Sequence, residues 1–77
     1  MQDNIKNANE LEFAIFCIEN LARRFNVSGA EMYRLLAEKS SILADYIVPG
    51  YETLHTQDKE YILDDLAEVM QERGISV

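Results

Sequence analysis

The only histidine of the chain, His55, lies in a run of residues that could move protons. Its neighbours in sequence include Glu52, Asp58 and Glu60, and a carboxylate beside an imidazole can orient the ring for acid–base work. Catalysis also needs a nucleophile or an oxyanion site, and no glycine-rich loop or evident second element supplies one. We therefore expect His55 to pack or cap where a loop meets a helix, and we expect no enzymatic activity.

Metal-ligating residues are sparse as well. Zinc prefers about four nitrogen or sulfur ligands, whereas the chain has one histidine and one cysteine, Cys17. No calcium-binding loop of the D-x-[DN]-x-[DN]-G type is present. Asp64 and Asp65 are adjacent, so on a helix they diverge by about 100° and do not form a pair. We predict no metal and no cofactor, and we interpret Cys17 as a small buried hydrophobic residue.

Acidic residues dominate the C-terminal part of the chain. The net charge is −7, and seven acidic residues but only one basic residue, Lys59, fall between Glu52 and Glu72. This charge repels nucleic acid and anionic membranes. Two interpretations stay open: a solvated helix face, or a docking surface for a basic partner with Tyr61 as an aromatic anchor. The candidate partner-binding residues are Tyr51, Glu52, His55, Tyr61, Asp64, Asp65 and Glu68.

The elements that must position these residues are predicted to be helical. Asn9, Ser28 and Thr56 are suitable N-caps before apolar runs, and Gly74 stands where a helix ends. We predict an all-α fold, a compact bundle of three main helices, a short helix and an extended crossing that contains Pro49. The main helices are expected at residues 10–25, 28–39 and 57–73, the short helix at 42–46 and the crossing at 47–55. Residues 1–8 are expected to be a flexible lead-in to a single domain at 9–77.

The first predicted helix is apolar on two sides. One side includes Leu11 and Ile15, and the opposite side carries Phe13, Phe16 and Cys17. Such a helix is either central and covered from two directions, or one of its sides meets another chain. Phe13 and Phe16 are therefore candidates for self-association in a homodimer.

Other features concern location and alternative functions. A single cysteine, the lack of a long apolar segment and a polar N-terminus lead us to expect a soluble cytoplasmic protein. The helices around 26–28 suggest a helix-turn-helix transcriptional regulator. The second of them has a mixed rather than basic outer side, with Glu31, Arg34, Glu38 and Lys39. An acidic inhibitor that mimics nucleic acid is a further alternative.

Four segments of the chain resemble a family of small bacterial proteins known as a domain of unknown function. They are ELEFAIFCIENLA, VSGAEMYRLL, DYIVPGYETLHTQDKEYILDDL and ERGI. The hallmark of that family is Y-E-x-L-H-T-Q, which matches Tyr51 to Gln57, and the likeness extends from Glu10 to Ile75. Asp58 departs from the pattern, where glycine is more usual.

The resemblance implies a compact helical domain encoded beside a larger protein similar to ADP-ribosyltransferases, in an arrangement similar to a toxin–antitoxin pair. It implies no catalytic residue. Our leading hypothesis is a non-enzymatic module for protein–protein interaction that serves as an antitoxin-like or inhibitory partner.

Overall fold

The computed structural model describes residues 7–77, and every regular element in that range is a helix. In chain order these are α1 (Ala8–Phe25), α2 (Gly29–Tyr33), η1 (Arg34–Glu38), η2 (Leu43–Ile47), α3 (Tyr51–Leu54) and α4 (Lys59–Glu72). The two η elements are π-helical, because an amide five residues along bonds to the carbonyl of Arg34 in η1 and to that of Leu43 in η2. The predicted all-α bundle is confirmed.

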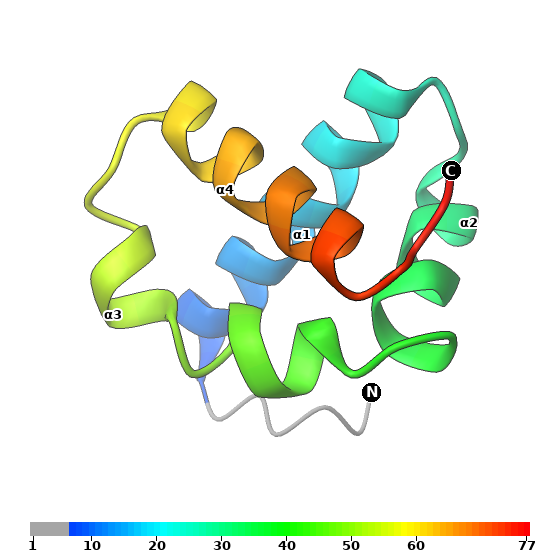
Figure 1. Cartoon of the computed structure of the whole chain (residues 1–77). Coiled ribbons are helices and arrows are strands. Elements are labelled where there is room, and N and C mark those ends of the chain that lie inside the picture. Colours follow the sequence, from blue (N-terminus) through cyan, green and yellow to red (C-terminus); the bar gives the residue numbers. More distant parts are fainter. Residues whose placement is uncertain (1–6) are drawn as a thin grey trace.

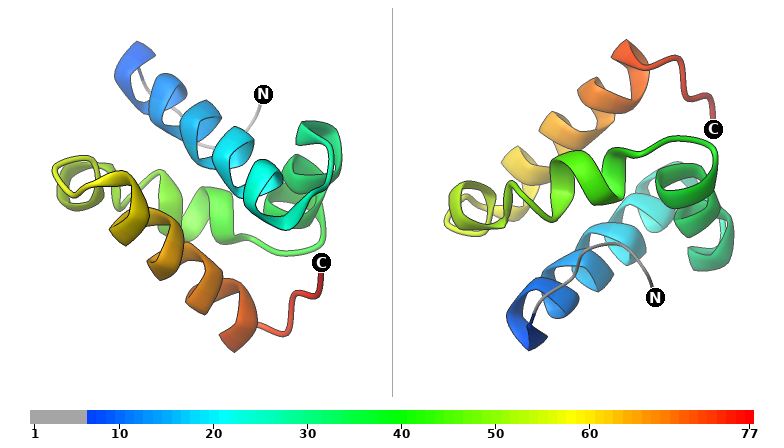
Figure 2. Two further views of the ribbon diagram at one scale, coloured as in Figure 1. Left: turned by 90° about the horizontal axis from the view of Figure 1, so that it is seen from above. Right: turned by 90° about the horizontal axis from the view of Figure 1, so that it is seen from below.

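The long helices α1 and α4 form the centre of the bundle. They cross in the view of Figure 1, where α2 follows α1 and packs against it. The segment from η2 to α3 runs across one face of both long helices, as the view from below in Figure 2 shows. Within residues 7–77, none of the helices combines the length and the apolar character that a membrane span requires.

One apolar core joins all six helices. Leu21, Leu36 and Leu66 are fully buried in it, and no polar or charged side chain is buried among the described residues. Full burial of one leucine side chain stabilises the fold by about 2 kcal/mol. The buried core consists of Phe13, Ala14, Cys17, Ile18, Leu21, Ala22, Met32, Leu35, Leu36, Ile42, Leu43, Ile47, Val48, Leu54, Ile62, Leu63, Leu66 and Met70.

Side-chain caps fix the starts of three helices. The side chains of Asn7, Ser28 and Asp58 each accept a hydrogen bond from the backbone amide three residues later in the chain, at 2.9, 3.0 and 2.9 Å. Ser28 confirms the prediction, whereas Asn9 and Thr56 were wrong as caps of the first and last helices. The Thr56 hydroxyl instead donates to the Thr53 carbonyl at 2.9 Å.

These caps move two boundaries. The first helix starts at Ala8 instead of residue 10, and the last starts at Lys59 instead of residue 57. The predicted lead-in therefore ends earlier than residue 8, and its residues 1–6 lie outside the described part of the chain. Gly74, at φ +74°, follows the end of α4 as predicted.

The predicted extended crossing at 47–55 is wrong. Ile47 ends η2, residues 48–50 form a turn, and α3 follows at once. Pro49 is accommodated because it stands in this turn, where its missing N–H costs no helical hydrogen bond. A Cβ atom on Gly50 would lie 2.6 Å from the Tyr46 carbonyl oxygen. Glycine therefore lets the chain fold back tightly after η2.

Candidate functional site

A groove of about 400 Å³ lies between α4 and the segment from η2 to α3. Leu54 is buried beneath it, whereas the Tyr61 side chain on α4 is 52% exposed. The groove therefore combines an apolar base with an accessible aromatic ring. Its lining residues are Asp45, Tyr46, Pro49, Gly50, Thr53, Leu54, Tyr61 and Asp65.

The two walls of the groove are joined by a hydrogen bond. The Tyr46 hydroxyl on η2 donates to Oδ2 of Asp65 on α4 at 2.5 Å. This hydrogen bond, helped by partial burial and by nearby negative charge, raises the pKa of Tyr46 to about 12. The phenol thus remains a neutral donor at physiological pH. Asp65 follows Tyr61 by four residues, so both lie on the same side of α4.

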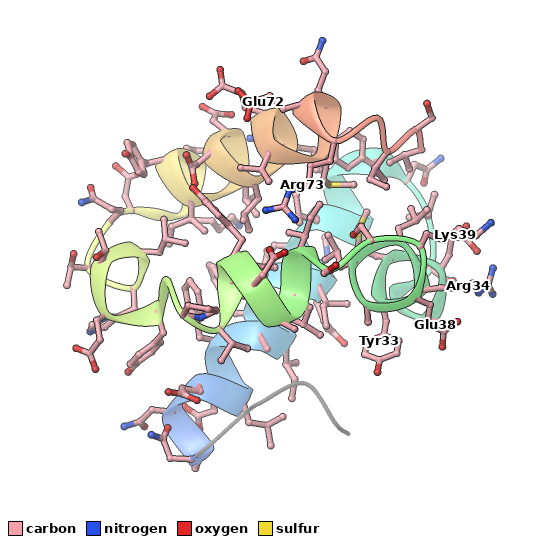
Figure 3. All side chains as sticks on the ribbon, turned by 60° about the horizontal axis from the view of Figure 1, so that its bottom comes forward. Tyr33, Arg34, Glu38, Lys39, Glu72 and Arg73 are labelled. Carbon is pink, nitrogen blue, oxygen red and sulfur yellow. The ribbon has the colours of Figure 1, made fainter. Side chains whose placement is uncertain are left out.

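An ion pair stands beside the groove. Nη1 of Arg73, just after α4, lies 2.9 Å from each carboxylate oxygen of Asp45 on η2. This hydrogen bond raises the pKa of the Arg73 guanidinium. In Figure 3 Arg73 extends from the end of α4 toward η2, while Glu72 points away from it. The C-terminal end of α4 and η2 are therefore linked by charge as well as by packing.

The predicted partner-binding residues do not form one surface. Tyr51 and His55 lie on the side of α3 that faces α1, where the Tyr51 ring meets Phe13 edge to face at 5.6 Å between centroids. The His55 ring stacks on Tyr51 at 4.3 Å, and its Nδ1 lies 2.6 Å from the Tyr51 carbonyl oxygen. His55 is thus packed at a helix end, as the sequence predicted.

The expected carboxylate neighbours of His55 are engaged elsewhere or point to solvent. Asp58 caps α4, and Glu60 binds Nη2 of Arg24 at 2.9 Å. Asp64 binds Nη1 of the same arginine at 2.8 Å, on the side of α4 that faces α1. Glu52 and Glu68 are exposed. Of the seven candidates, the groove brings together Tyr61 and Asp65 alone.

Phe13 and Phe16 occupy different positions from those predicted. Phe13 is 8% exposed and belongs to the core, so it does not present a free face, and Phe16 is half-buried beside it with ring centroids 6.3 Å apart. Leu11 and Ile15 are exposed instead, at 37% and 45%. The side of α1 that carries Phe13 and Phe16 was considered as a free surface, and in the structure η2 and α3 cover it.

A family model described as "Protein of unknown function (DUF3791)" matches residues 12–73. The chain belongs to this family. The match extends from α1 to the end of α4, and it confirms the expected membership of a family of unknown function. It includes every residue that lines the groove. No curated protein and no solved structure matched the chain.

Other potential sites in this DUF3791 domain are less developed. Burial raises the pKa of the Cys17 thiol to about 12, so the thiol is unreactive in the folded chain. Residues 7–77 contain no group of three His, Cys, Asp or Glu side chains placed to hold a metal ion. On the outer side of α2 and η1, Arg34 pairs with Glu31 at 2.7 Å. Figure 3 shows Glu38 and Lys39 nearby, so this side carries both signs of charge rather than the basic surface typical of a DNA-reading helix.

The candidates identified from the sequence include only two of the eight residues that line the groove. Asp45 and Tyr46 were assigned to a short helix and Pro49 to a crossing, and none of the three was a candidate partner-binding residue. One signal was available: Asp45 and Tyr46 are an adjacent acidic and aromatic pair outside the apolar positions of their segment. Their proximity to α4 depends on the turn at 48–50 and on the helix α3 that follows it, which the sequence pattern did not predict.

Proposed function

We propose that this protein is a non-enzymatic module for protein–protein interaction, with the groove between η2, α3 and α4 as its contact surface. The observation that carries the proposal is the 52% exposed Tyr61 on the wall of a groove of about 400 Å³. Tyrosine is enriched at the energetic centres of interfaces because it adds a large apolar ring and one polar group. The other aromatic rings are buried or partly buried, whereas the Tyr61 ring is accessible.

Chemistry at the site also favours binding over catalysis. The His55 ring lies against the Tyr51 carbonyl on the far side of α3, and the Cys17 thiol is fully buried. The groove itself has a neutral phenol, a hydrogen-bonded carboxylate and apolar side chains. This set can hold a side chain of a partner by packing and hydrogen bonds, and it contains no activated nucleophile.

We further propose that the partner is a larger protein similar to ADP-ribosyltransferases and that this module acts as its antitoxin-like or inhibitory partner. The support is the resemblance of the segment from Tyr51 to Gln57 to the Y-E-x-L-H-T-Q motif. Thr53 and Leu54 in this segment line the groove, whereas the Tyr51 ring packs against Phe13 on the side of α3 that faces α1. The motif thus contributes to the shape of the proposed surface.

A pull-down after co-expression with the product of the neighbouring gene tests the proposal. The intact chain should retain that product, and Tyr61→Ala should weaken the complex by about 30-fold, the loss typical of an interface hot spot. Leu11→Ala is the matched control, because Leu11 is an exposed apolar residue on α1 away from the groove. The proposal fails if no complex forms, or if Tyr61→Ala and Leu11→Ala have equal effects.

A further inference from the structure

The charges around the groove are unbalanced. Asp45 and Asp65 line it, and Glu72 is close enough to add negative charge at both Tyr46 and Arg73. Arg73 is the only cation paired with any of these three carboxylates among the described residues. The Tyr46 phenol is neutral at physiological pH and therefore offsets none of this charge. The groove therefore has an excess of negative charge in a chain whose net charge is already −7.

The ion pair between Arg73 and Asp45 is weak. A single nitrogen, Nη1, lies 2.9 Å from both Asp45 oxygens, so the two-nitrogen fork that strengthens arginine–carboxylate pairs is not formed. The Arg73 and Asp45 side chains are 38% and 49% exposed. Ion pairs this accessible are strongly screened by water, and a competing cation can displace them at little cost.

Asp65 has room for a second donor. The Tyr46 hydroxyl bonds to its Oδ2, and none of the donors among the described residues bonds to its Oδ1. A carboxylate can accept several hydrogen bonds at once. The exposed Tyr61 ring one turn earlier on α4 is placed to pack against the aliphatic stem of a long side chain that reaches this carboxylate.

We propose that the groove receives an arginine or lysine side chain from a protein partner, and that Arg73 competes with this side chain for Asp45. The proposal rests on the interaction function above and specifies the chemistry of the partner. Charge complementarity selects a basic segment, because an acidic one would meet Asp45 and Asp65 in the groove and the negative charge of Glu72 beside it. Arg73 then limits affinity from within the same chain.

The test uses the full chain and two short peptides, acetyl-Leu-Arg-amide and the same peptide with citrulline in place of arginine. Citrulline keeps the shape of arginine but has no charge. Nuclear magnetic resonance titrations should move the signals of Tyr46, Tyr61 and Asp65 with the arginine peptide. The arginine peptide should bind at least about 5-fold more tightly than the citrulline peptide, and Asp65→Asn should weaken it about 3-fold, as expected for an accessible pair.

Arg73 provides the more demanding measurement. Arg73→Gln should strengthen arginine-peptide binding by about 2- to 5-fold, and Arg73→Lys should return it toward the original value. Arg34→Gln is the matched control, because it removes the same charge and also releases a carboxylate, that of Glu31, on the outer side of the bundle. It should change the affinity by less than about 1.5-fold. Thermal melts of each variant confirm that the fold is retained.

Two results overturn the inference: equal binding of the arginine and citrulline peptides, or equal strengthening by Arg73→Gln and Arg34→Gln. The interaction function is judged separately by the pull-down. If Tyr61→Ala abolishes the protein complex while the peptide comparison fails, the function stands and the basic side chain is wrong. If the arginine peptide binds as expected and the intact chain forms no protein complex, the cation-binding groove stands and the function is wrong.

Discussion

Gly50→Ala should destabilise the protein although it adds a single methyl group at a partly buried position. The new Cβ would lie 2.6 Å from the Tyr46 carbonyl oxygen and 3.1 Å from Cδ1 of Leu54. The leucine can adjust its side chain, but the carbonyl is backbone and already accepts the Gly50 amide at 2.9 Å. The substitution must therefore move the turn between η2 and α3, which also forms the base of the groove.

The size of the effect follows from two opposing contributions. Forcing an extra methyl group into a close backbone contact costs about 2 kcal/mol of unfolding free energy. Replacing glycine by alanine also restricts the unfolded chain, which returns about 0.4–1 kcal/mol. The net loss is about 1–1.6 kcal/mol, and at ~4–8 °C per kcal/mol for a domain of this size the midpoint of melting falls by about 4–13 °C.

Urea and thermal unfolding followed by far-ultraviolet circular dichroism measure this loss. Gly29→Ala is the internal control, because a Cβ at Gly29 meets no atom within 4 Å and its φ is not positive. Gly29→Ala restricts the unfolded chain without adding a close contact, so its free energy of unfolding should rise by about 0.4–1 kcal/mol. If Gly50→Ala is as stable as the original chain, or if both glycine variants shift stability in the same direction, the close contact at Tyr46 does not have the role assigned to it.

Three further predictions concern single side chains. Asp58→Ala should lower the unfolding free energy by about 1 kcal/mol, because it removes the cap of α4, whereas Asp58→Gly should lower it by only a few tenths of a kcal/mol. Equal losses for the two variants in urea titrations would contradict the capping role. The pKa of the Tyr46 phenol is about 12 in the folded chain and an ordinary 10.0 in the unfolded chain, so its protonated form stabilises the fold. This stabilisation is complete below pH about 10 and is lost as the pH rises toward 12. In an absorbance titration Asp65→Asn should return one tyrosine toward the ordinary range, and an unchanged curve would refute the hydrogen bond as the cause. The Cys17 thiol should react with a disulfide reagent at least about 30-fold more slowly in the folded than in the unfolded chain, because burial raises its pKa from 9.0 to about 12 and the lower thiolate fraction is only partly offset by higher nucleophilicity. Equal rates in buffer and in urea would show that Cys17 is accessible.

Local signals predicted the helices well where one capping arrangement was available and less well where two competed. Ser28 has a glutamate three residues on and was identified correctly. Asn7 and Glu10 have the same spacing as Asn9 and Glu12, and the structure uses the earlier pair, which lengthens α1. Spacing alone does not distinguish two such pairs, because the choice depends on the packing gained from extra turns.

The groove could be predicted only in part, because it depends on contacts between distant segments. Tyr61 and Asp65 share a side of α4, and this follows from helical periodicity. Their meeting with Tyr46 requires the tight turn at Gly50, which was interpreted as an extended crossing because it contains a proline. The surplus apolar side of α1 was recognised correctly, but which side is covered depends on where η2 and α3 pass. Phe13 is consequently in the core, and Leu11 is exposed.

The π-helical form of η2 lets this segment lose one residue with little change in the orientation of the residues that follow it. Its turn holds one residue more than an α-helical turn, because the Val48 amide bonds back to Leu43 rather than to the residue after it. Deleting one residue between 43 and 47 would let an ordinary α-helical turn form, and later positions would keep nearly the same orientation around the helix axis, because five π-helical and four α-helical residues turn the chain by about the same angle. A one-residue alignment gap here should thus be tolerated among relatives, and it would mark a relative that keeps the shape of the groove with an α-helical turn in place of η2.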